Sequence, residues 1–132
     1  MDVERLRRLP LFGELDHHDL SIVAGWTGEF HLPDGNLLFE QGSMPYELFV
    51  IEAGGAEVTR DGEHVATIGP GDVVGEMGLL KLQRRSASVR AVGDLRAVTL
   101  DADGIAAIAE EMPEVAERIR ETMARREREN EG

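Results

Sequence analysis

Cysteine is absent from this sequence of 132 residues, and aromatic residues make up only 5% of it. Without cysteine the chain cannot form disulfides, thiolate nucleophiles or cysteine-based zinc sites, and a cytoplasmic location is the simpler expectation. The remaining composition, 42% hydrophobic and 30% charged, predicts a single folded domain over residues 1–132. A chain of this length buries enough surface to be stable without a metal or a disulfide.

Basic residues are scarce as well, because 14 lysines and arginines stand against 26 aspartates and glutamates, a net charge of −12. That charge repels phosphate backbones and anionic lipid surfaces, so neither nucleic acid nor a membrane is an expected partner. The sequence also lacks an apolar run near the roughly 20 residues of a membrane-spanning helix, and it begins without the apolar centre of a signal peptide. An anionic ligand would therefore need a local pocket.

Residues 1–26 are helical in pattern. Leucine and valine recur at helical spacing, with interruptions at Pro10 and Gly13. Asp16 is placed to cap the helix that follows it, because aspartate accepts hydrogen bonds from the first free amides of a helix. We therefore expect N-terminal helices ahead of the first strand.

Residues 27–101 consist of short apolar segments separated by turn residues, which predicts an antiparallel β-roll or sandwich. Asp61-Gly62 is the favoured two-residue hairpin loop. Counting outward from this loop pairs Arg60 with Glu63 and Val58 with Val65, so that opposite charges meet at the turn and the valines share a face.

Other strands are expected on both sides of this hairpin. Residues 46–51 are apolar on both faces, as in the middle of a sheet, and glycines close this strand at 52–55. Two more strands, 86–92 and 95–100, flank a turn at 93–94. The predicted fold is mainly β, with helices at both ends.

Residues 102–132 are helical again. One helix is expected over 101–112, and Pro113 suits the first turn of a second helix that runs to Ala124, after which the chain frays. The apolar residues of the second helix share one face: Val115, Ile119 and Met123. This stripe is too short to distinguish packing onto the rest of the domain from pairing with a second copy of the chain.

The residues that carry chemistry lie in the glycine-rich stretch 71–87. A tight turn leads into one expected helical turn, whose first amides attract anions, and Gly75 and Gly78 let a ligand approach the backbone. Arg85 can present a planar fork to two phosphate oxygens, while Glu76 can accept a hydrogen bond from a sugar hydroxyl. A phosphorylated sugar satisfies both residues.

Here the sequence becomes specific. Gly75-Glu76-Met77-Gly78-Leu79-Leu80 followed by Arg85-Ser86-Ala87 resembles the phosphate-binding cassette of the cyclic nucleotide-binding domain family. That family includes catabolite activators and regulatory subunits of protein kinase A. The resemblance extends from about Leu9 to Met123 and includes further segments of the family's strands and turns: Leu32-Pro33-Asp34-Gly35, Phe39-Glu40-Gln41-Gly42, Phe49-Val50-Ile51 with Gly54, and Pro70-Gly71-Asp72.

The resemblance implies a β-roll of the jelly-roll type that holds cAMP or cGMP, with the cassette at residues 75–87. It assigns the ribose 2′-hydroxyl to Glu76 and the cyclic phosphate to Arg85, and it leaves the choice of base open at Ser86. It implies no catalytic residue, no metal and no cofactor besides the nucleotide. The residues expected at the ligand are Val74, Gly75, Glu76, Met77, Gly78, Leu79, Arg85, Ser86 and Ala87.

The resemblance also gives the last helix, residues 113–124, the role of a lid over the base. No aromatic residue follows Phe49 to stack on a purine, so Ile119, Met123 or Arg125 would have to cap it. This arrangement predicts weaker or less selective contact with the base than an aromatic cap gives.

The expected function is that of a regulatory sensor without enzymatic activity, in which binding moves the C-terminal helix and signals to an unidentified effector. Two alternatives stay open: a β-roll that binds another protein without nucleotide, and the sensor part of a catabolite-activator type transcription regulator without its DNA-reading helices. A cupin-type metal enzyme needs clustered histidines, whereas His31 and His64 stand alone. A hydrolase would need a nucleophile motif that the sequence lacks.

Overall fold

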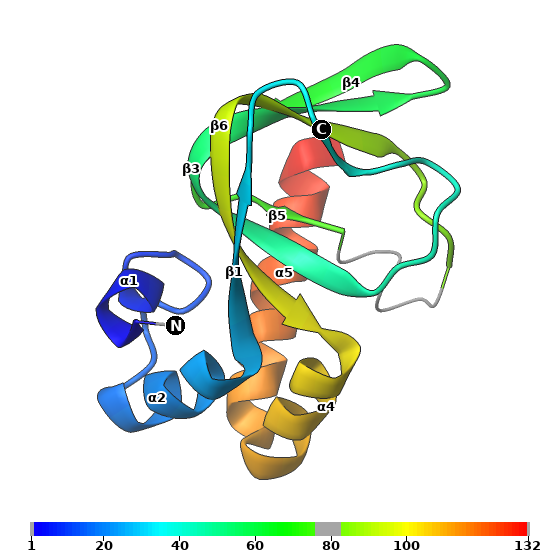
Figure 1. Cartoon of the computed structure of the whole chain (residues 1–132). Helices are drawn as coiled ribbons and strands as arrows, with labels where there is room; N and C mark the ends of the chain where they lie inside the picture. Colours follow the sequence, from blue (N-terminus) through cyan, green and yellow to red (C-terminus); the bar gives the residue numbers. More distant parts are fainter. Residues whose placement is uncertain (1, 76–82, 132) are drawn as a thin grey trace.

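Figure 1 shows the chain as a computed structural model that describes residues 2–75 and 83–131, without the side chains of 122, 123 and 126–131. An antiparallel β-roll carries two short helices at its N-terminal end and two at its C-terminal end. The helices are α1 (Val3–Arg7), α2 (His17–Trp26), α4 (Ala102–Glu111) and α5 (Pro113–Glu131). The strands are β1 (Thr27–Leu32), β2 (Leu37–Phe39), β3 (Glu47–Arg60), β4 (Glu63–Ile68), β5 (Val73–Val74) and β6 (Ser88–Asp101). The predicted fold class is confirmed.

Two long antiparallel strands, β3 and β6, organise the roll. The order of the sheet is β1-β6-β3-β4, with β2 paired to β6 and β5 paired to β3. The first half of β3 pairs with the end of β6, and its second half pairs with the beginning of β6. Each long strand therefore belongs to both halves of the roll.

The expected breaks at residues 52–55 and 93–94 are wrong, because β3 and β6 each continue through them. The glycines there make a bend with shifted register instead of a loop. Gly54 adopts φ +81°, and a Cβ at this position would collide with the backbone carbonyl of Asp94. A residue without a side chain lets the two strands stay paired at this bend.

The β3–β4 hairpin turns at Asp61-Gly62, as predicted, with φ of 55° and 82° at the two residues. Arg60 pairs with Glu63, also as predicted. The expected pairing of Val58 with Val65 is wrong, because the register shifts and Val58 lies opposite Ala66. Val65 is the extra residue of this bulge and is exposed.

The alternation of side chains along β3 divides the core into two clusters. Leu48 and Val50 face the helices, whereas Phe49 and Ile51 face the interior of the roll. The prediction of a strand with two apolar faces is confirmed for this part of β3, because both clusters are buried. The first cluster holds the helices on the sheet, and the second fills the roll.

The terminal helices have the expected N-terminal cap but not the expected C-terminal end. Asp16 caps α2 by accepting a hydrogen bond from Asp19 N, and Asp101 caps α4 in the same way through Gly104 N. The expected end of the last helix at Ala124 is wrong, because α5 continues to Glu131 and runs behind the roll (Figure 1).

The apolar face of α5 packs within the chain. Val115 and Ile119 are 8% and 3% exposed and belong to the cluster beneath the helices, so these residues pack onto their own domain. In the part of the chain that the structure describes, no helix is both long enough and apolar enough to span a bilayer.

Candidate functional site

Arg85 is the one buried charged residue among those described, with 5% of its surface exposed. Its Nη1 donates to the carbonyl oxygen of Gly75 and its Nη2 to that of Glu47, both at 2.6 Å. The guanidinium carbon lies 4.2 Å from the centre of the Phe39 ring. Burial of an arginine is costly without such partners, so these contacts hold the cation at a defined place.

The strand β5 brings the first of these carbonyls to Arg85. Val73 and Val74 pair with Val50 and Phe49 of β3, so the next residue, Gly75, lies beside the start of β3. Gly75 has φ +86°, and a Cβ on it would overlap Arg85 Nη1. The backbone conformation favours glycine here, and any larger residue would also displace the end of the Arg85 side chain.

The backbone of Arg85 is fixed by the loop between β2 and β3. Gly42 N donates to Arg85 O at 2.8 Å, and Arg85 N donates to Ser43 O at 2.9 Å. The neighbouring Arg84 is exposed and donates from Nη1 to Gly42 O at 3.0 Å. Of these two adjacent arginines, only Arg85 points into the fold.

Glu47 places a carboxyl group near this cation. Burial raises the pKa of Glu47, and the negative charge of Asp101, its partner across β3 and β6, raises the pKa further. The positive charge of Arg85 acts in the opposite direction on the same pKa. The balance favours a less strongly charged Glu47 beside the arginine.

Besides Arg85, three of the expected ligand residues are buried or bonded in this part of the fold. Val74 and Ala87 are buried at 8% and 7% exposure, and Gly75 accepts the hydrogen bond from Arg85. Ser86 is exposed, and its carbonyl accepts a hydrogen bond from Arg60 Nε at 3.1 Å. Four expected residues lie outside the described part of the chain: Glu76, Met77, Gly78 and Leu79.

The expected lid residues are not equivalent. Ile119 is buried among the helices, which takes it away from any surface that a base could reach in this arrangement. Arg125 is exposed, and the side chain of Met123 lies outside the description. In this conformation, Arg125 is the described member of the three that is accessible.

Sequence reasoning missed the roles of Glu47 and Phe39. The carbonyl of Glu47 orients the guanidinium, but every residue has a carbonyl, so no sequence signal marks this one. Phe39 was part of a recognisable strand segment, and its packing against Arg85 depends on the pairing of β2 with the start of β6.

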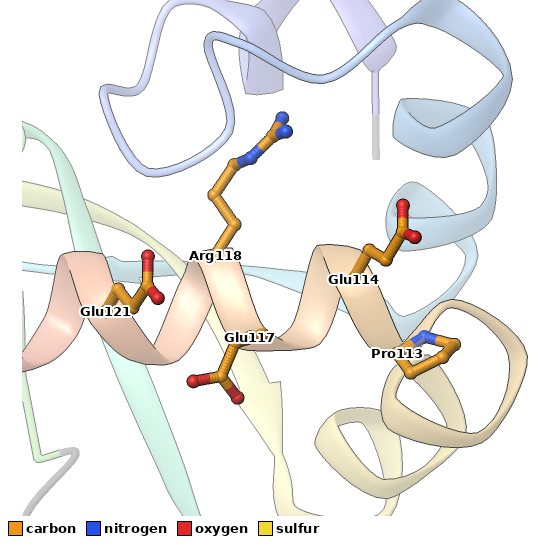
Figure 2. Close-up of a pocket in the computed structure, with 5 residues that line it drawn as sticks. All are labelled: Pro113, Glu114, Glu117, Arg118 and Glu121. Carbon is orange, nitrogen blue, oxygen red and sulfur yellow. The ribbon is translucent and has the colours of Figure 1, made fainter.

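A surface hollow of about 420 Å³ lies along α5, away from Arg85. Figure 2 shows Glu114 and Arg118 on one side of the helix and Glu117 on the other. Three of its five lining residues are glutamates, which repel a phosphate, so the hollow does not fit an anionic nucleotide. Among the described residues, no group of His, Asp or Glu side chains is arranged to hold a metal ion.

Comparisons with known proteins identify the family to which this chain belongs. Residues 29–112 match the cyclic nucleotide-binding domain family. The chain is 41% identical over 95 residues to the Pycsar effector protein XpPycTIR of Xanthomonas perforans, covering 71% of this chain and 31% of that protein. It is 31% identical over 125 residues to the cyclic AMP receptor protein of Thermus thermophilus, covering 91% of this chain and 58% of that protein.

A solved structure confirms the fold. The crystal structure of the Thermus thermophilus catabolite activator protein matches with a TM-score of 0.79 at 31% identity, over 91% of this chain and 59% of that chain. The present chain thus spans less than two thirds of the lengths of these relatives. It belongs to the cyclic nucleotide-binding domain family, in the type found in catabolite activators and protein kinase A regulatory subunits.

Proposed function

We propose that this domain is a sensor that binds a 3′,5′-cyclic nucleotide through Arg85 and transmits binding to α5, without catalysing a reaction. The observation that carries the proposal is the buried guanidinium of Arg85, held by two neutral carbonyls in a chain with a net charge of −12. A buried, oriented cation is suited to a compact anion such as a cyclic phosphate.

Two backbone carbonyls set the orientation of the Arg85 guanidinium. A guanidinium carries five N–H donors, and the carbonyls of Gly75 and Glu47 fix its plane. The cyclic phosphate has one negative charge and two exocyclic oxygens, so a planar fork fits it. The family resemblance adds Glu76 for the ribose hydroxyl, amides near Gly78 and Leu79 for the phosphate, and packing by Ser86 and Ala87.

The strand β5 supports the proposed coupling to α5. Val73 is buried in the same cluster as Ala116 and Ile119 of α5, and two residues later the carbonyl of Gly75 accepts from Arg85. A ligand that favours one position of this strand must favour the α5 position that packs with it. The size of the effect equals the difference in ligand affinity between the two positions.

The test is a calorimetric titration of the purified protein with cAMP and cGMP, with 5′-AMP as the uncyclised control. The name of the Thermus relative makes cAMP the first ligand to try. Micromolar or tighter binding of a cyclic nucleotide, without binding of 5′-AMP, is the expected result. If neither cyclic nucleotide releases heat nor raises the melting temperature, the sensor proposal fails and a nucleotide-independent interaction module replaces it.

A further inference from the structure

Gln41 connects the turn of the β3–β4 hairpin to the segment that carries Arg85. Its amide nitrogen Nε2 donates to Asp61 Oδ1 at 2.9 Å, and its amide oxygen Oε1 accepts from Asp61 N, also at 2.9 Å. The same residue donates from its backbone N to Ser88 Oγ at 2.8 Å. One side chain and one amide thus join three segments that are distant in the sequence.

The next two residues of this loop hold Arg85 directly. Gly42 and Ser43 make a reciprocal pair of backbone hydrogen bonds with Arg85, at 2.8 and 2.9 Å. Arg60, the residue directly before Asp61 at the end of β3, donates from Nε to Ser86 O at 3.1 Å. The backbone of Arg85 is therefore tied to the loop that Gln41 fastens, and the next residue, Ser86, is tied to the hairpin.

Asp61 is the one non-glycine residue with positive φ in the described part of the chain, at φ 55°. Aspartate tolerates this conformation, but it is less favourable there than glycine or asparagine. Both bonds from Gln41 go to Asp61, one to its side chain and one to its backbone N–H. These two hydrogen bonds stabilise the arrangement in which the turn lies against the loop that bonds to Arg85.

We propose that Gln41 and Asp61 form a clasp that positions Arg85, so that nucleotide affinity depends on two exposed residues that bond to each other rather than to the guanidinium. The proposal rests on the proposed function and adds positioning residues to the same site. An opened clasp lowers the fraction of molecules with Arg85 in place, and the apparent dissociation constant rises by that factor.

Four variants separate the parts of the clasp. Gln41→Ala removes both bonds and is expected to raise the Kd for the bound cyclic nucleotide about fivefold. Asp61→Gly keeps the turn but removes the side-chain acceptor, so it raises Kd less. Asp61→Asn is the matched control, because asparagine suits the turn and keeps an acceptor oxygen, and its Kd stays at the wild-type value. The double variant Gln41→Ala/Asp61→Gly is expected to bind the nucleotide no more weakly than Gln41→Ala alone, because both changes disrupt the same contact between residues 41 and 61.

Hydrogen exchange of the ligand-free protein supplies a readout that does not need a nucleotide. In Gln41→Ala the amides of Gly42 and Arg85 exchange faster, while those of Val50 and Val98 in the centre of β3 and β6 keep their rates. If the clasp only stabilises the hairpin, Gln41→Ala speeds exchange of the β4 amides and leaves the exchange rates of Gly42 and Arg85 unchanged. That result overturns the proposal.

The two proposals fail in different ways. If the wild-type protein binds no cyclic nucleotide, the sensor function is lost, and the exchange rates of Gly42 and Arg85 still decide whether the clasp positions Arg85. If the wild type binds and Gln41→Ala binds equally well, the clasp is overturned while the sensor function stands. Faster exchange with an unchanged Kd overturns it too.

Discussion

Two arginines tie distant parts of this molecule together, and the hydrogen-bond acceptors described for them differ in charge. Arg85 is buried and donates to the carbonyls of Gly75 and Glu47. Arg5 on α1 is about one third exposed; it donates from Nε and Nη2 to the two carboxylate oxygens of Glu52 at 3.1 and 2.6 Å, and its Nη1 pairs with Glu29.

The two arginines differ in the charge of the groups to which they donate. Two carboxylates neutralise Arg5, and the hydrogen bond and charge of Glu52 raise its pKa further, so this arginine fastens α1 to β3 and β1. The carbonyls that Arg85 donates to carry no net charge and set the plane of its guanidinium. The first arrangement is suited to holding a structure together, and the second to receiving an anion.

The sharpest test of this comparison is Arg85→Ala, with Arg84→Ala as the control. Removing the buried fork deletes the charge-assisted hydrogen bonds to the phosphate, each of about 1.5–3 kcal/mol, so affinity for the cyclic nucleotide falls by roughly a hundredfold or more. Arg84 is exposed beside it and bonds to the Gly42 carbonyl, so its removal is expected to lower affinity far less than the removal of Arg85. Calorimetry measures both.

Arg85→Lys keeps the charge but loses the planar fork, and it is expected to recover only a small part of the affinity. A circular dichroism spectrum shows whether each variant is folded. A folded Arg85→Ala protein that binds as tightly as wild type would remove Arg85 from the site.

Gly75→Ala tests whether the close approach of the guanidinium depends on glycine. Gly35→Ala is the matched control, because Gly35 has φ +84° and open space around its Cβ position, whereas Gly75 has φ +86° and its Cβ would overlap Arg85 Nη1. Both variants incur about 1–2 kcal/mol for a left-handed alanine. Gly75→Ala is expected to lose about 1–3 kcal/mol more, because the buried side chain must move.

Urea denaturation measures the difference in unfolding free energy, and titration measures affinity. Weakened nucleotide binding is expected in Gly75→Ala and normal binding in Gly35→Ala. Equal loss of stability in the two variants would mean that Arg85 adapts to the added methyl group without cost, and its close approach to residue 75 would then not depend on glycine.

Much of the fold followed from local patterns. The Asp16 cap, the Asp61-Gly62 turn and the two-faced strand around Val50 depend on neighbouring residues, and each is confirmed. The long strands could not be predicted in one piece. Gly54 and its neighbours look like a loop in the sequence, because the partner strand that uses the missing side chain lies 40 residues further along the chain.

In the candidate site too, the sequence indicates some features, while others depend on how distant strands pair. Arg85 was indicated by its place after a glycine-rich segment, since charge and spacing are visible in sequence. The carbonyls that orient it were not, because their selection depends on β5 lying beside β3. The Val58–Val65 error has a related cause, since a one-residue bulge leaves no signal in a pattern of alternating valines.

Glu47→Gln changes the electrostatics around Arg85 while keeping the backbone carbonyl that binds it. Burial and Asp101 raise the pKa of Glu47, so the folded protein takes up this proton more readily than the unfolded chain, and charged Glu47 disfavours folding at neutral pH. The variant is therefore expected to be more stable than wild type at pH 7. Its advantage shrinks as pH falls through the raised pKa of the folded state and is gone below the ordinary pKa of 4.5, where the glutamic acid is neutral in both states.

Removing this carboxylate also removes a negative charge near the incoming phosphate, so Glu47→Gln is expected to bind the cyclic nucleotide slightly more tightly at pH 7. Denaturation curves between pH 4 and 8 and titrations at pH 7 give both readings. A stability gain that grows on acidification would contradict the assigned direction of the pKa.

The smallest effect is expected at Arg5, where the comparison predicts a role in structure alone. Arg5→Gln breaks the contacts with Glu52 and Glu29 and lowers the melting temperature slightly. Arg7→Gln removes the same charge from the same helix, but it breaks looser contacts: a pair with Glu4 at 3.7 Å and a hydrogen bond to the Leu15 carbonyl at 3.5 Å. The difference should disappear in about 1 M salt, where the Debye length falls to about 3 Å. Neither variant should change nucleotide affinity, because a neutralised arginine has no charge to offer a phosphate. If Arg5→Gln weakens binding while Arg7→Gln does not, the attachment of α1 is part of the binding equilibrium, and the division between a fastening arginine and a receiving arginine no longer holds.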